Sequence, residues 1–138
     1  MEIARLEPGD HAEVEGAAHL FDGPAREDAT RLFLEDPTHH LLLAYDEGVP
    51  VGFVSGVELT HPDKGTEMLL YELAVDEPFR RKGIARALVE RLATVARERG
   101  CYGMFVLAER SNDVALATYA ALEPAETEDC VMFTWEPL

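Results

Sequence analysis

Three cations and a glycine stand together in the middle of the chain, and their types suit phosphate binding. Arg80, Arg81, Lys82 and Gly83 follow an apolar, strand-like run and precede a clear helical pattern. The first turn of a helix has N–H groups without preceding carbonyls, and these attract anions together with the positive end of the helix dipole. Glycine lets a ligand approach the backbone where a Cβ would block it. We predict that this stretch, continued to Ala85, binds a coenzyme pyrophosphate; the alternative is a solvated charge cluster.

A carboxylate lies inside the apolar run Glu67–Val75 that leads to this stretch. Regular strand alternation would put one set of side chains on one face, namely Tyr71, Leu73 and Val75, and the other set on the opposite face, namely Leu70, Glu72 and Ala74. Because burying an unpaired charge is costly, we expect Glu72 to face a cleft or to have a partner. Beside a coenzyme it would be a candidate base or ammonium-binding group, whereas on an edge strand it would be ordinary.

The rest of the chain alternates between patterns of strand and helix. We expect strands at Glu2–Leu6, His39–Tyr45, Pro50–Leu59, Glu67–Val75, Met104–Leu107 and Val131–Trp135. Helices are expected at His11–Phe21, at Ala25–Leu34 with Ala29, Leu32 and Phe33 buried, from Gly83 to Gly100, and from Asn112 to Leu122. Gly52 and Gly56 interrupt one strand, which indicates bulges or a close ligand approach.

The composition indicates one folded domain, residues 1–138, with 47% hydrophobic residues. No apolar run reaches the roughly 20 residues of a membrane helix, and the N-terminus lacks the features of a signal peptide. Two cysteines, Cys101 and Cys130, suggest no disulfide scaffold, and the histidines lack metal-ligand spacing. We therefore expect a cytoplasmic protein without a metal and without a membrane partner.

The charge balance favours one class of partner. Twelve basic residues against 27 acidic ones give a formal charge of −15. A polyanion such as nucleic acid is an unfavourable partner for this surface, and a cationic small molecule is a favourable one. Solubility and adaptation to salt are alternative reasons for such acidity.

Two motifs give the chain a family resemblance. Arg80-x-x-Gly83-x-Ala85 follows an apolar strand, and the helix further on carries Asn112-x-x-Ala-x-x-x-Tyr119. Together, in this order, they resemble the acetyl-coenzyme A motifs of the GNAT N-acetyltransferase superfamily. The blocks YELAV, FRRKGIARAL and VMF are similar to small aminoglycoside 3-N-acetyltransferases.

The resemblance implies a fold and a set of roles. The fold is an α/β (α+β) one, with a mixed, mostly antiparallel central sheet, about four flanking helices and a β-α-β coenzyme-binding core. Acetyl-CoA would be the co-substrate, with Glu72 as base and Tyr119 as the acid that protonates the departing thiolate. The residues implied in coenzyme binding are Leu73, Ala74, Val75, Arg80, Arg81, Lys82, Gly83, Ile84, Ala85, Asn112 and Tyr119. The first helices would line the acceptor side with Asp22, Glu27, Asp28, Glu35 and Asp36.

The chain departs from the family pattern at two places, and the acceptor stays open. Glu123-Pro124 stands where Gly-Phe is usual, and Leu69 stands where histone-type members carry a catalytic Glu. The acceptor alternatives are a polyamine, an amino acid, another small metabolite or a protein amine. Two further readings are a coenzyme-binding module without turnover and an acidic interaction protein. Small members of the superfamily often dimerise, so a homodimer is implied by analogy.

Overall fold

The computed structural model describes all residues from Met1 to Leu138 and divides into two compact units, Met1–Leu107 and Ala108–Leu138. The larger unit contains the strands β1 (Glu2–Arg5), β2 (His39–Asp46), β3 (Val49–His61), β4 (Gly65–Val75) and β5 (Met104–Val106). Its helices are α1 (His11–Gly16), α2 (Glu27–Glu35) and α3 (Ile84–Glu98), with 3-10 turns at Ala18–Leu20 and Glu77–Phe79. The smaller unit contains α4 (Asp113–Ala120).

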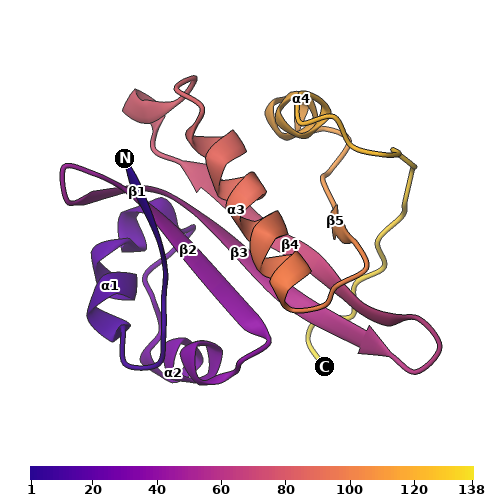
Figure 1. Ribbon diagram of the computed structural model, residues 1–138, viewed down its shortest axis with the longest axis horizontal. Helices are drawn as coiled ribbons and strands as arrows, with labels where there is room; N and C mark the ends of the chain where they lie inside the picture. Colours follow the sequence, from indigo (N-terminus) through magenta and orange to yellow (C-terminus); the bar gives the residue numbers. More distant parts are fainter. The chain divides into compact units, whose positions relative to one another are not determined.

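The five strands form one sheet in the order β1-β2-β3-β4-β5. The first four pair antiparallel, and β5 pairs parallel with β4 after the chain has crossed through α3 (Figure 1). A parallel pair needs such a crossover, because a tight turn can only reverse the chain. The predicted mixed, mostly antiparallel sheet with a β-α-β core is confirmed.

One face of the sheet carries a core built with the first two helices. Its buried residues are Val14, Ala17, Leu20, Leu34, Leu41, Leu43 and Phe53. Phe21 stands edge-on to Phe53 at 5.0 Å between ring centroids, so the segment between α1 and α2 is also held against the sheet. This contact places the following loop, which carries Asp22, over this face.

The helical segments themselves differ in detail from the prediction. The first one breaks after Gly16 into α1 and a 3-10 turn, where one continuous helix was expected. On α2, Leu34 is buried and Phe33 half-buried, whereas Ala29 and Leu32 are exposed. The predicted buried side of α2 was therefore wrong in two of three residues, because the helix meets the sheet mainly near its C-terminal end.

The other face of the sheet is covered by α3, which lies across β3 and β4 (Figure 1). A Cβ at Gly52 would lie 3.3 Å from side-chain atoms of both Ile84 and Leu88, and one at Gly56 would lie 2.9 Å from Leu92. Gly52 and Gly56 therefore face the helix α3 and not a ligand. The strand pairing is irregular beside both glycines, so the bulges predicted as the alternative are confirmed.

A bulge in β4 changes which face its residues occupy. Ser55 pairs with Glu72 while the next residue, Gly56, pairs with Leu70, so Tyr71 has no partner on β3. An extra residue of this kind reverses the side of every residue beyond it. Leu70 therefore faces α3, and Glu72 faces the opposite side, whereas a regular strand had been predicted to put both on one face.

The two ends of α3 are defined by glycines with positive φ. Gly83, at φ 82°, is the N-cap, and Gly100, at φ 80°, follows the last turn. At the C-terminal end, the N–H of Cys101 donates to the carbonyl of Ala96 and that of Gly100 to Arg97, at 2.9 and 3.1 Å. This pair of bonds is a Schellman motif, which ends the helix as predicted.

The smaller unit holds one helix and one failed prediction. Asn112 caps α4, as its side-chain oxygen accepts from the N–H of Ala115 at 3.0 Å. The predicted strand Val131–Trp135 is not a strand, and its side chains are exposed. Strand-forming residues need a neighbouring strand to satisfy their backbone groups, and no strand pairs with this segment.

No helix combines the length and the apolar character needed to cross a bilayer. No group of three or more His, Cys, Asp or Glu side chains is arranged to hold a metal ion.

Candidate coenzyme and acceptor site

The loop Arg80–Ala85, called the phosphate-binding loop after the role predicted for it, leads from the end of β4 into α3. A 3-10 turn, Glu77–Phe79, precedes it, and the Nε of Arg80 donates to the carbonyl of Val75 at 2.9 Å. The Nζ of Lys82 lies 5.3 Å from the centre of the Phe79 ring, a cation–π distance. These contacts tie both ends of the basic stretch to the strand and the turn before it, so the loop has a defined course.

The backbone of this loop presents N–H groups at the start of α3. The first helical hydrogen bond runs from the N–H of Ala87 to the carbonyl of Gly83, at 3.0 Å. The N–H groups of Ile84 and Ala85 therefore precede the helical ladder. No acidic residue lies in the first turn to compete with an incoming anion.

The backbone conformation of Gly83 favours glycine. Its φ of 82° lies in the left-handed region, where a side chain is strained. A Cβ placed on it would meet no protein atom within 4 Å, so the space above it is open. The close ligand approach predicted from the sequence thus has room, and the side chain of Ile84 points away into the core, 6% exposed.

An open strand edge lies next to the loop. Pairing of β4 with β5 ends at Leu70, so the later part of β4 lacks a neighbour on that side. The N–H of Asp76 bonds the carbonyl of Val51 on β3, at 2.8 Å. Backbone groups alternate in direction along an antiparallel pair, so Ala74 also bonds towards β3, whereas the N–H groups of Leu73 and Val75 point to the open edge.

Glu72 lies on the α1 and α2 face of β4 and is half-buried. Burial first, and then the negative charge of Asp22, raise the pKa of the Glu72 carboxyl above its ordinary value. A like charge disfavours ionisation, so the charge of Asp22 adds to the larger effect of burial. Of the acidic residues predicted for the acceptor side, Asp22 is the one whose charge acts on Glu72.

The two family-motif residues of the smaller unit lie on α4 or at its start. Asn112 is the N-cap, so its side-chain oxygen is engaged by the N–H of Ala115. Tyr119 is half-buried in the last turn of the helix, and burial raises the pKa of its phenol. The phenol is protonated at neutral pH, as a proton donor must be, although the raised pKa makes it a weaker acid than an exposed tyrosine.

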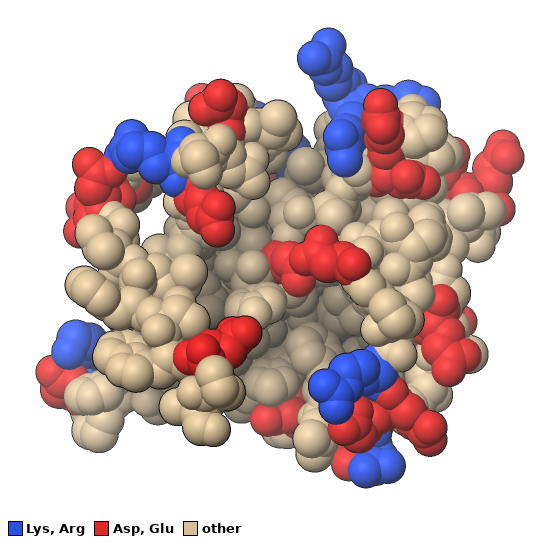
Figure 2. Space-filling view, turned by 180° about the vertical axis from the view of Figure 1, so that it is seen from behind, with Lys and Arg blue, Asp and Glu red and all other residues tan.

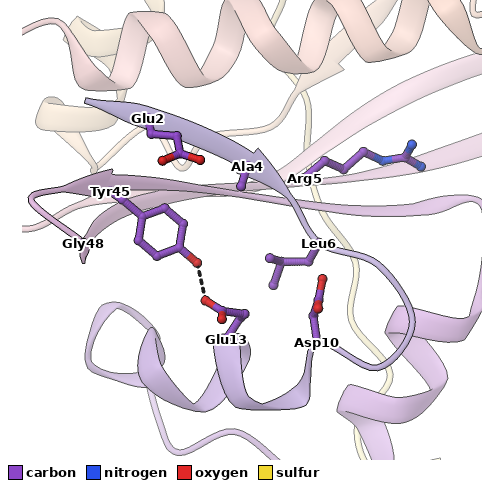
Figure 3. A pocket seen from close by; sticks show the side chains of 8 residues that line it. All are labelled: Glu2, Ala4, Arg5, Leu6, Asp10, Glu13, Tyr45 and Gly48. Atoms are coloured by element: carbon purple, nitrogen blue, oxygen red, sulfur yellow. Dashed lines mark hydrogen bonds between the residues drawn. The ribbon is translucent and has the colours of Figure 1, made fainter.

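A hollow between β1, β2 and α1 was not expected from the sequence (Figure 3). The hydroxyl of Tyr45 donates to the carboxylate of Glu13 at 2.6 Å, with Glu2 and Asp10 at the same hollow. Burial and then Glu13 raise the pKa of the Tyr45 phenol. The residues that line this hollow come from separate elements and share no motif, so nothing in the sequence indicated that they would lie together.

Acidic side chains predominate over basic ones on the face drawn in Figure 2, in line with the net charge of −15. The field of such a surface attracts cations and repels polyanions.

Known proteins with the same features define the class of this domain. The model of the acetyltransferase (GNAT) family matches residues 5–123. An acetyltransferase of Yersinia enterocolitica is 33% identical over 105 residues, which cover 76% of this chain and 70% of that protein. The chain therefore belongs to the GNAT family of acetyltransferases.

Two further similar proteins are described by the substrate that they acetylate. The L-2,4-diaminobutyric acid acetyltransferase of Streptomyces coelicolor is 48% identical over 54 residues, but these are 38% of this chain and only 31% of that protein. The crystal structure of an aminoglycoside acetyltransferase from an uncultured soil metagenomic sample superimposes with a TM-score of 0.84 at 28% identity, covering 99% of this chain and 97% of the other. The family places this domain among the N-acetyltransferases, whose co-substrate is acetyl-CoA.

Proposed function

We propose that the protein transfers an acetyl group from acetyl-CoA to a primary amine of a cationic small molecule. The observation that carries the acceptor class is the pair Glu72 and Asp22: two carboxylates close enough for one charge to raise the pKa of the other. A cationic amine between them would relieve this repulsion. We also propose that residues 1–138 act as one functional domain.

Acetyl-CoA supplies the acetyl group as a thioester, which is reactive towards a neutral amine. The N–H groups of the phosphate-binding loop, Arg80–Ala85, bind the pyrophosphate, and the cations beside them add charge. The outward N–H groups of Leu73 and Val75 bind the carbonyl oxygen and stabilise the negative charge that develops on it. Holding the two reactants in place provides a large part of the rate.

Proton transfer is divided between two side chains. Glu72, directly or through a water, accepts a proton from the ammonium, since only the neutral amine attacks. Tyr119 donates a proton to the leaving thiolate, and Asn112 lies near the coenzyme; both roles are carried over from the family motif. A buried, protonated phenol suits the role of Tyr119.

The acceptor is an aminoglycoside in the first proposal and a diamino acid in the second. The structural neighbour that acts on aminoglycosides supports the first. The 48% identity to a diaminobutyric acid acetyltransferase, over 54 residues, supports the second. Both molecules carry more than one amino group, which suits a pair of carboxylates and a surface of charge −15.

Release of free thiol from acetyl-CoA tests this function with a panel of amines. We expect kcat/KM to be highest for an aminoglycoside or for 2,4-diaminobutyrate, and low for glutamate, whose extra carboxylate meets Glu72 and Asp22. Spermidine tests whether several positive charges alone suffice. Thiol release equal for all amines, or highest for glutamate, contradicts a cationic acceptor.

A further inference from the structure

A chain of polar side chains crosses the sheet far from the phosphate-binding loop; the side chains of its middle members, His40 and Glu58, are buried, and the arginines at its two ends are exposed. The guanidinium of Arg5 donates to Nδ1 of His40 at 2.8 Å, and Nε2 of His40 lies 2.7 Å from Oε2 of Glu58. Arg99, directly after α3, donates from Nε to the same oxygen at 2.8 Å. The chain thus joins β1, β2 and β3 to the C-terminal end of α3.

The hydrogen bonds fix the proton on His40. A guanidinium has no acceptor, so Nδ1 accepts from Arg5 and Nε2 carries the hydrogen that is donated to Glu58. The imidazole is therefore neutral, and its burial, with 1% of the residue exposed, lowers its pKa. Glu58 is the only carboxylate in the chain of contacts and stays ionised, because Arg99 and His40 outweigh its burial and lower its pKa.

The Glu58 side chain is only 6% exposed, although it carries a charge. Removing such a charge from water is expensive, and this cost can exceed the attraction between the partners of a buried ion pair. The free energy of the ion pair alone therefore does not account for a buried charge at Glu58, and the geometry of its contacts has to be considered. Its distinctive geometric consequence is that one directional contact holds the end of α3.

The contacts of α3 with β3 run in the same order along both elements. Gly52 receives Ile84 and Leu88, and Gly56 receives Leu92. Ile84, Leu88 and Leu92 are spaced four residues apart and therefore lie on one face of the helix. Because each makes a similar apolar contact with β3, these contacts distinguish only weakly between neighbouring axial positions of α3. Apolar attraction is also non-directional, and alone it would resist a small axial displacement weakly.

A charge-assisted bond at the end of this row is directional and short. We propose that Glu58 is a positioning residue: by binding Arg99 it sets the axial position of α3 on the sheet, and thereby the position of the phosphate-binding loop at the other end of the helix. With 15 residues, α3 transmits this over roughly 22 Å, at 1.5 Å per residue. The proposal rests on the pyrophosphate site proposed above.

The test is the dissociation constant of CoA, measured by calorimetry at a temperature where each variant is fully folded by circular dichroism. For Glu58→Gln, which removes the charge and keeps the shape, we expect Kd to rise about tenfold, the change that 1.4 kcal/mol of lost binding produces. Arg99→Gln leaves the His40–Glu58 contact in place and should raise Kd similarly, and Arg99→Lys should restore part of the affinity. Arg91→Gln, at an exposed arginine of the same helix, is the matched control and should keep the wild-type Kd.

The double variant separates positioning from general destabilisation. If the two residues act through one contact, the double variant Glu58→Gln with Arg99→Gln should have a CoA Kd no higher than that of the single variant that binds CoA more weakly. A lower melting temperature with Kd within twofold of the wild type overturns the proposal and leaves Glu58 a purely structural residue. Gly83→Asp serves as the reference: if it keeps full CoA affinity, the pyrophosphate site itself is wrong, whereas if only Glu58→Gln keeps it, the positioning role alone is wrong.

Discussion

The surroundings of Glu72 raise the pKa of its carboxyl. Half-buried on β4 and close to the charge of Asp22, it has a raised pKa and is a stronger base than an exposed carboxylate. A base must be ionised to accept a proton, so activity should fall as the pH drops through the pKa of Glu72.

This relation predicts the effect of changing Asp22. Asp22→Asn removes the negative charge that raises the pKa of Glu72, so the acid limb of the kcat/KM profile should move to lower pH. Glu35→Gln, an exposed acidic residue at the end of α2, is the matched control and should leave the limb in place. A profile that is the same in Asp22→Asn and in the wild type would contradict the influence of Asp22 on the group that titrates in this limb.

Tyr119 tests the other half of the proton transfer. Tyr119→Phe removes the hydroxyl and keeps the ring, so we expect kcat to fall by about 10²-fold, the lower range for general acid–base catalysis, with little change in CoA affinity. Stopped assays of thiol release and CoA calorimetry measure the two effects separately. Full turnover in Tyr119→Phe would exclude the phenol as the proton donor.

At the scale of elements, the turn from β4 into α3 concentrates the binding groups. Gly83→Asp combines a strained backbone with a carboxylate at the proposed pyrophosphate site, and we expect CoA binding to become undetectable by calorimetry. Gly48→Asp is a matched control, because Gly48 also has a positive φ, 80°, and open space around it, but lies in the turn between β2 and β3. Each variant should lose about 1 kcal/mol of stability from strain. Equal CoA affinity of the two variants would contradict the site.

The sequence predicted the regular elements well because their signals are local. Alternation identified β1, and apolar runs bounded by turn residues identified the hairpin of β2 and β3. The stripe of Ile84, Leu88 and Leu92 identified α3, and Gly100 indicated its C-terminal end. The order β4, α3, β5 followed from the rule that parallel strands need a crossover.

The features that lay beyond sequence reasoning depend on pairing between distant segments. The bulge at Tyr71 exists only through the register of β4 against β3, and it decides that Glu72 faces Asp22's side of the sheet. The strand predicted at Val131–Trp135 failed because strand propensity does not supply a pairing partner. The Arg5–His40–Glu58–Arg99 chain joins four segments, and no spacing in the sequence marks it.

At the scale of the whole molecule, the net charge of −15 favours the proposed cationic acceptor. A GNAT domain with a formal charge of −15 concentrates cations near its surface, and this effect weakens as salt screens it. The same charge opposes the anionic coenzyme, so the local cations and N–H groups of the phosphate-binding loop must overcome the overall repulsion. Substitutions in this loop therefore test the proposed function most directly.

The most direct test is a calorimetric titration of the purified protein with acetyl-CoA, followed by addition of an aminoglycoside to the same sample while free thiol is recorded. We expect saturable binding at one site per chain, lost in Gly83→Asp and kept in Gly48→Asp, and then thiol release when the amine is added. Absence of binding by the wild-type protein would contradict the central claim that it uses acetyl-CoA. Binding without thiol release for any amine of the panel would leave a coenzyme-binding module and contradict the proposed turnover.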